Sequence, residues 1–179
     1  MTSNRRSSKK QKSESSMTLK VKITDKNLNA ARKRAANIGP NAKKIQKGGE
    51  LVGMLGEQLF LDNYGGDLID CHDYDIDHPK IGRIDIKTKR CASPPQDHYY
   101  CTVAAYQINK ANCDYYGFYR VHNNLTDGWF LGIISKEEFI EKATFFKKGT
   151  MDGAFEVKSD CYNIKISDLK EISEVLKEA

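Results

Sequence analysis

Residues 74–90, YDIDHPKIGRIDIKTKR, combine a turn with two flanking segments in which apolar and charged residues alternate. The turn composition of residues 78–82 predicts that the flanks pair as an antiparallel hairpin. With this turn as the loop, Asp75 lies directly opposite Asp85. Asp75, Asp85 and Lys87 then share one face of the hairpin, and the apolar residues pair on the other (Tyr74 with Ile86, Ile76 with Ile84).

Two carboxylates directly opposed across neighbouring strands repel each other, so this pairing favours a bound cation. Ligands that offer only oxygen suit Mg²⁺ or Mn²⁺ better than zinc. Lys87 points to the same side, where it could hold an attacking water or meet charge that develops on a phosphate. The alternative is that Asp75, Asp85 and Lys87 are exposed strand residues joined by a salt bridge.

The register leaves a second choice of carboxylate open. Asp73 and Asp77 lie on the same face as Asp75, and a shift of two residues would exchange them. Asp75 is preferred because Tyr74 and Ile76 bracket it as core residues.

Residues 50–64 (ELVGMLGEQLFLDNY) predict the clearest helix, with a leucine-rich core stripe and Gly65-Gly66 as its end. Gly53, Gly56 and Glu57 fall on another flank of this helix. A glycine in a helix interior costs about 1 kcal/mol. We therefore expect a strand or a ligand to approach this flank closely.

The remaining pattern predicts one domain over residues 48–179, of mixed α/β (α+β) class. A helix opens at the capping box of residues 135–138 and continues to about residue 143, and Ser167 is expected to cap a last helix. The expected strands are residues 67–76, 83–89, 99–106, 115–122, 129–134 and 162–166.

Charge is distributed unevenly along the chain. Residues 1–49 carry 14 basic and 2 acidic side chains, whereas residues 50–179 carry 15 basic and 22 acidic ones. We expect a disordered basic tail over residues 1–20 and a basic helical segment over 21–47, with a helix over 25–38 that Asp25 caps. These charges form either a solvated surface or a DNA-facing one. The candidate DNA contacts are Arg32, Lys33, Arg34, Lys43, Lys44, Lys47, Lys89 and Arg90.

Several protein classes are not expected. No apolar run is long enough to span a membrane, and no secretory signal precedes the domain, so a cytoplasmic protein is predicted, in the host cytoplasm if it is viral. Five cysteines without a CxxC pair predict reduced thiols.

The arrangement of Asp75, then Asp85-Ile86-Lys87, after a helix bearing Gly56-Glu57, resembles the PD-(D/E)xK nuclease superfamily. The segments IDIKTKR, DYYGFYRV and GWFLGIISKEEF look especially like phage-type or bacterial members. The resemblance covers roughly residues 48–172, but only its acidic and lysine positions are specific. Tyr74 stands where many members have proline.

This resemblance implies a restriction-endonuclease-like core, with a central mixed β-sheet flanked by helices. It implies a Mg²⁺-dependent DNA endonuclease in which Mn²⁺ can substitute and metal-activated water attacks the phosphodiester. The DNA is expected to be double-stranded or branched, and cleavage of both strands would favour a homodimer. The implied residues are Asp75, Asp85, Glu57 and the Ile86 carbonyl as metal ligands, Lys87 at the water, and Gln107 as an assisting side chain.

Alternatives remain at each level. Glu57 could instead be a solvent-facing helix residue, and Gln107 could cap a strand end. The whole chain could be a DNA-binding module with a vestigial, inactive nuclease core, or a protein with no nucleic-acid role.

Overall fold

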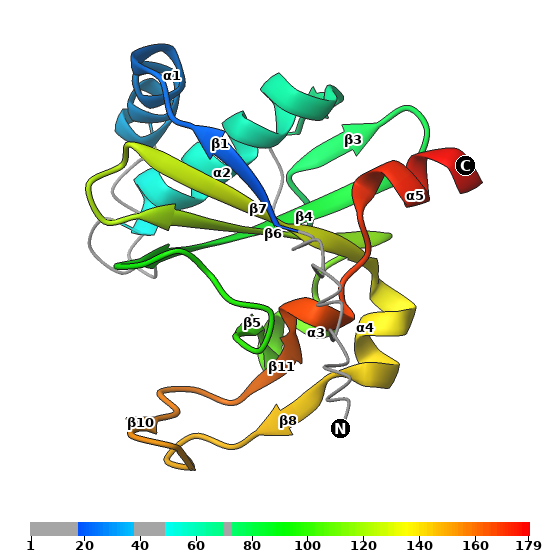
Figure 1. The fold of residues 1–179 in the computed structure, drawn as a ribbon. Coiled ribbons are helices and arrows are strands. Elements are labelled where there is room, and N and C mark those ends of the chain that lie inside the picture. The colour runs from blue at the N-terminus through cyan, green and yellow to red at the C-terminus, as the bar shows by residue number, and fades with distance from the viewer. Residues whose placement is uncertain (1–17, 38–48, 70–72) are drawn as a thin grey trace, which may run out of the picture.

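The computed structural model describes residues 18–37, 49–69 and 73–179, and its central feature is a six-stranded mixed sheet (Figure 1). Strands β4 and β6 run parallel at its centre, and all other neighbours are antiparallel. The strand order is β1 (Leu19–Lys22), β7 (Asp127–Ser135), β6 (Tyr115–His122), β4 (Gly82–Cys91), β3 (Ile76–His78) and β2 (Asp67–Leu68).

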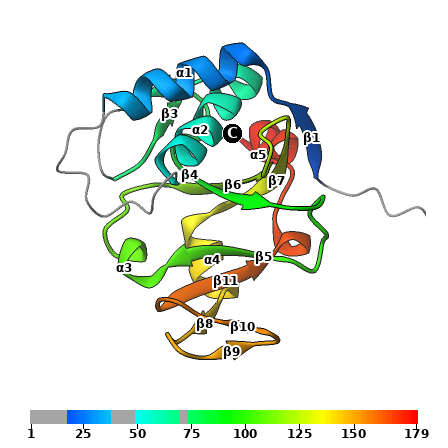
Figure 2. The same ribbon diagram turned by 90° about the vertical axis from the view of Figure 1, so that its left-hand side faces the viewer.

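Helices cover one face of this sheet (Figure 2). They are α1 (Asp25–Ala36), α2 (Gly49–Tyr64) and α5 (Ile172–Glu178). The leucine-rich stripe of α2 forms the core with the sheet, where Leu55, Leu59 and Phe60 are buried with Ile84 and Ile86 of β4. Thus α2 lies against β4, and α1 packs on α2.

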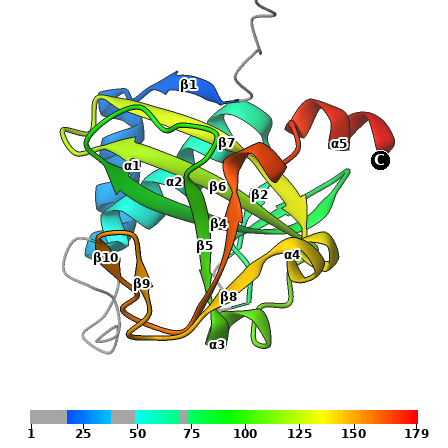
Figure 3. The same ribbon diagram turned by 60° about the horizontal axis from the view of Figure 1, so that its bottom comes forward.

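A second, three-stranded sheet lies on the opposite side of the first one (Figures 2 and 3). Its order is β5 (Tyr100–Ala104), β11 (Cys161–Lys165) and β8 (Thr144–Phe146). Val103 and Ile164 from this sheet share a core with Tyr116, Phe118 and Phe139. The remaining elements on this side are α3 (Ala105–Ile108), α4 (Lys136–Lys142), the hairpin of β9 (Met151–Asp152) and β10 (Phe155–Glu156), and the 3-10 turn Ile166–Asp168.

The mixed α/β class is confirmed, and so is the predicted register where β3 and β4 pair; the pairing ends at Ile76, so Asp75 and Tyr74 are not paired with Asp85 and Ile86 as expected. Ile76 pairs with Ile84, and His78 pairs with Gly82 across the turn. Ser135 caps α4, since its hydroxyl accepts a hydrogen bond of 3.2 Å from the Glu138 amide. Each of these features depends on residues close together in the sequence.

The predicted boundaries differ from the structure in several elements. The strand expected over 67–76 is two short strands, β2 and β3, and the strand expected over 99–106 ends at Ala104, where α3 begins. Thr24, rather than Asp25, caps α1 in a capping box with Asn27. Ser167 lies in the 3-10 turn, so α5 starts five residues after it, at Ile172.

Strands β1, β8, β9 and β10 were not predicted, because each has only two to four residues. Leu19 and Lys20, which end the expected tail, form the first half of β1 and pair with β7. Within the described ranges, no helix has the length and apolar character needed to cross a membrane. The cysteines of the described residues are free thiols.

Candidate active site

The candidate site lies at the edge of β4 beyond the point where β3 pairs with it. Asp75 directly precedes β3, and its amide donates a hydrogen bond of 3.0 Å to the Ile84 carbonyl. Its carboxylate Oδ2 accepts a bond of 2.7 Å from the backbone amide of Ile86. The Asp75 carboxylate therefore accepts the hydrogen bond from the Ile86 amide that a backbone carbonyl of a longer β3 would have accepted. This bond fixes the carboxylate against β4.

Helix α2 brings Glu57 to the same edge because Gly56 allows a close approach to β4. A Cβ atom on Gly56 would lie 1.8 Å from Oγ1 of Thr88. The sequence predicted that a strand or a ligand approaches this flank of the helix; at Gly56 the prediction is confirmed, and the approaching element is strand β4. Gly53 has no such role, since a Cβ there would meet nothing within 4 Å.

The carboxylates of this edge influence one another. The pKa of Asp75 is raised well above its ordinary range, first by burial and then by the negative charges of Glu57 and Asp85. The bond from the Ile86 amide and the charge of Lys87 oppose this rise without cancelling it. These three acids and Lys87 therefore form one electrostatic group, in which the negative charge is incompletely compensated.

Two basic side chains neutralise two of the acids. Lys87 Nζ lies 2.8 Å from Oδ2 of Asp85, and Arg34 of α1 forms an ion pair with Glu57. The side chains of Asp85 and Glu57 are only 10% and 13% exposed, so each needs a partner of opposite charge in this structure. Asp75 has no ion pair within the described part of the chain.

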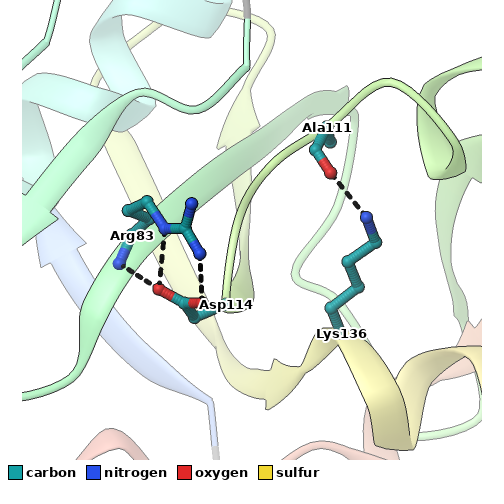
Figure 4. A network of polar contacts seen from close by, with 4 residues as sticks. All are labelled: Arg83, Ala111, Asp114 and Lys136. Atoms are coloured by element: carbon teal, nitrogen blue, oxygen red, sulfur yellow. Dashed lines mark hydrogen bonds and ion pairs between the residues drawn. The ribbon is translucent and has the colours of Figure 1, made fainter.

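A network of polar contacts holds the strands behind the site in place (Figure 4). The guanidinium of Arg83, at the start of β4, binds both carboxylate oxygens of Asp114 at 2.8 and 3.0 Å, and this keeps the pKa of Asp114 below its usual range. The Arg83 amide also donates to Asp114, at 2.9 Å. Nearby, Lys136 of α4 donates to the Ala111 carbonyl. The starts of β4 and β6 are thereby tied together beside Asp85.

Cys113 lies in the loop that this network holds, close enough to Asp85 to be affected by its charge. Burial, and secondly Asp85, raise the pKa of Cys113 to about 11. The thiol is therefore mainly protonated at neutral pH in the metal-free protein.

The predicted DNA contacts are scattered. Arg32 and Lys33 are exposed on α1, whereas Arg34 is turned inward to Glu57. Lys89 of β4 lies opposite Arg120 of β6. The other predicted residues are Arg90, which bonds the Asn123 carbonyl at 3.1 Å, and Lys43, Lys44 and Lys47, which lie outside the described residues.

Gln107 and Ile86 were predicted at the site from the resemblance alone. Gln107 lies on α3, which packs against β5 and β11. Ile86 lies between Asp85 and Lys87, with its side chain buried in the core and its amide bonded to Asp75.

Arg34 is the one residue whose role at this site was not foreseen. The sequence places it in a run of three basic residues, and no spacing relates it to Glu57, which lies 23 positions further along the chain. Its position results from the packing of α1 on α2.

The donor set fits a hard divalent cation in kind, because three carboxylates that repel one another offer only oxygen. In the ranges that the structure describes, however, no three His, Cys, Asp or Glu side chains are placed as a ready-made metal group. The ion pairs of Lys87 and Arg34 hold two of the acids in their present positions. No family model and no curated protein matches the chain, so the choice of function rests on these residues.

Proposed function

We propose that this chain is a Mg²⁺-dependent DNA endonuclease with a restriction-endonuclease-like core of the PD-(D/E)xK type. The observation that carries the proposal is the placement of three acids at one edge of β4: Asp75 is held there by the Ile86 amide at 2.7 Å, close enough to Asp85 and Glu57 for their charges to raise its pKa. A folded protein that holds three acids together at this cost is suited to bind a cation among them. The neighbouring Lys87 supplies the positive side chain that phosphodiester hydrolysis requires.

Asp75, Asp85 and Glu57 would hold the cation, with Mn²⁺ able to replace Mg²⁺. When bound, the cation lowers the pKa of a coordinated water and offsets charge on the phosphate. Asp85 would then no longer depend on Lys87 for neutralisation. The Lys87 ammonium would be free to hold the attacking water or to stabilise the charge that develops on the phosphate.

The basic part of the chain would hold the DNA backbone near this acidic site. Arg32 and Lys33 are exposed on α1, and α1 packs on the helix that carries Glu57. Positive side chains displace counterions from DNA, so binding by this surface should weaken steeply as salt increases. The acidic residues of the body would repel DNA in the absence of a cation.

Cleavage of supercoiled plasmid and of a labelled branched duplex tests the proposal. We expect cleavage by the wild-type protein with Mg²⁺, and a loss of about a hundredfold or more with Asp85→Asn or Lys87→Gln. Asp77→Asn is the matched control, because Asp77 is an exposed acid of the same hairpin and its replacement removes the same charge. Cleavage that survives both site variants, or that falls equally with Asp77→Asn, would contradict the assignment.

A DNA-binding module with a vestigial site is the second candidate. The ion pairs Lys87–Asp85 and Arg34–Glu57 favour it, because they neutralise two of the acids without a metal. Thermal unfolding with added Mn²⁺ or Ca²⁺ separates the candidates, since a ligand that binds only the folded state raises the midpoint. If the metal raises the unfolding midpoint of the wild type but not that of Asp85→Asn, the result supports the nuclease. If the protein binds DNA in a salt-dependent way, but the metal neither raises the midpoint nor allows cleavage, the result supports the vestigial module.

A further inference from the structure

A groove of about 760 Å³ lies between the two sheets, and it includes Lys89, two residues along β4 from Lys87. Its walls come from β4 and β6 of the first sheet, from β5 and β11 of the second, and from the β9–β10 hairpin. The hairpin lies on the same side of the molecule as the C-terminal end of β4 (Figures 1 and 3). A volume of this size accommodates a small organic ligand.

The groove and the site share one face of β4. Asp85, Lys87 and Lys89 alternate along this strand, so their side chains emerge on the same side, toward the second sheet. Four residues of strand separate Asp85 from Lys89 by about 13 Å. An extended oligonucleotide bound at Asp85 and Lys87 can therefore continue into the groove.

One wall of the groove carries two unneutralised cations. Lys89 and Arg120 are directly paired across the parallel strands β4 and β6. Like charges at such positions destabilise a sheet, and within the described residues neither side chain has a carboxylate partner. Arg120 instead donates a bond of 2.9 Å to the Tyr100 carbonyl. Partial burial and the charge of Arg120 lower the pKa of Lys89.

The opposite wall carries acids and an exposed aromatic ring. Glu156 is neutralised by Lys158 at 3.0 Å, and Asp152 is half-buried on the hairpin. Asp152 therefore disfavours an anion on the hairpin side, whereas Lys89 and Arg120 favour one on theirs. Phe155 is 80% exposed in the hairpin, although it lines the groove. A large exposed aromatic beside cations is the combination that binds an unpaired nucleotide.

We propose that this groove binds single-stranded DNA, with a phosphate at Lys89 and Arg120 and an unpaired base stacked on Phe155. The inference rests on the proposed function, and it names the class of substrate. A strand that passes the carboxylates must be unpaired on the Lys89 side, as at a flap, a gap or a single-stranded end. A base within an intact duplex has no free face to stack on Phe155.

The test measures binding of the full chain to fluorescein-labelled oligothymidylate in EDTA, so that cleavage plays no part. We expect Phe155→Ala to weaken binding about tenfold or more without changing its salt dependence. We expect Lys89→Gln to weaken it and to reduce the slope of log affinity against log salt by about 0.7. Phe155 is exposed, so Phe155→Ala should keep the wild-type melting temperature, and Lys89→Gln should not lower it, because it removes a like charge opposite Arg120.

Lys80→Gln is the matched control, because Lys80 is an exposed cation in the turn before β4 and does not line the groove. We expect it to weaken oligothymidylate binding less than Lys89→Gln does. A duplex of the same length should bind equally well to wild type and Phe155→Ala. The inference is overturned if Phe155→Ala leaves oligothymidylate binding unchanged, if it weakens duplex binding equally, or if Lys80→Gln weakens binding as much as Lys89→Gln.

These outcomes are separate from those of the nuclease assay. If oligothymidylate binding depends on Lys89 and Phe155 but no DNA is cleaved with Mg²⁺ or Mn²⁺, the proposed role of the groove stands and the nuclease proposal is wrong. If DNA cleavage depends on Asp85 but Phe155→Ala leaves oligothymidylate binding unchanged, the nuclease proposal stands and the proposed role of the groove is wrong.

Discussion

Replacing Gly56 by alanine tests how closely helix α2 approaches strand β4, and thereby how Glu57 reaches the site. The new Cβ would lie 1.8 Å from Thr88 Oγ1, about 1.6 Å short of the 3.4 Å at which ordinary contact begins. Rotation of Thr88 does not remove the conflict, because its Cβ and Cγ2 lie only 3.0 and 3.1 Å away. Helix and strand must therefore separate, or the strand must deform.

The same substitution at Gly53 supplies the control. A Cβ there meets nothing within 4 Å, and the position lies in the same helix. Both substitutions gain about 1 kcal/mol because alanine favours a helix interior over glycine. Only Gly56→Ala adds an overpacking cost, which is typically about 1 to 3 kcal/mol. The difference between the two variants is therefore the packing cost itself.

Thermal unfolding by circular dichroism measures this difference. For a chain of this length, 1 kcal/mol shifts the melting temperature by about 2 to 4 °C, so Gly53→Ala should melt roughly 2 to 12 °C above Gly56→Ala. Adding Thr88→Ala to Gly56→Ala should restore part of the loss, since the Thr88 hydroxyl is buried without a hydrogen-bond partner. Equal stability of the two glycine variants would refute the close contact between α2 and β4.

Three further substitutions probe the site and the fold. Asp75→Asn should stabilise the metal-free protein at pH 7 and have no such effect below about pH 4. Burial raises the pKa of Asp75 in the folded state, whereas its pKa in the unfolded state is about 3.9. The free energy of unfolding of the wild type therefore falls as pH rises between these two pKa values, by about 1.4 kcal/mol per pKa unit. Urea unfolding at several pH values checks this, and a constant gain would contradict it. Arg34→Gln should cost on the order of 2 kcal/mol in urea unfolding, because it leaves Glu57 unpaired, and adding Glu57→Gln should recover most of the loss. Ser135→Ala should lower the melting temperature by about 2 to 4 °C through loss of the helix cap, and no change would indicate that the bond to Glu138 is not made.

The hairpin was predictable because its determinants are local. The turn between His78 and Gly82 and the apolar residues beside it favour one register over the two-residue shift, and Ile76 does pair with Ile84. The glycine at position 56 was also informative, since its cost in a helix indicated a close neighbour. The sequence did not indicate that this neighbour is strand β4, because that depends on the three-dimensional packing.

Contacts between distant segments were not predictable from the pattern. Arg34 reaches Glu57 only because α1 crosses α2 at a particular place, and Arg83 binds Asp114 from 31 positions away. Strand β1 has four residues, LKVK, and its partner β7 lies more than a hundred residues further along the chain. Such pairings depend on which strand edge is left free once the rest of the sheet has formed.

The position of β1 affects how the basic N-terminal region can be dissected. It pairs with residues 127–130 of β7, a nine-residue strand whose side chains are almost all buried. A truncated protein that begins after Lys22 would leave the backbone of these four residues unpaired, and such an edge can template pairing with other chains. Loss of DNA binding in such a protein would then report aggregation as readily as lost charge. Charge-neutralising substitutions, or truncations that end before Leu19, keep the edge covered and separate the two effects.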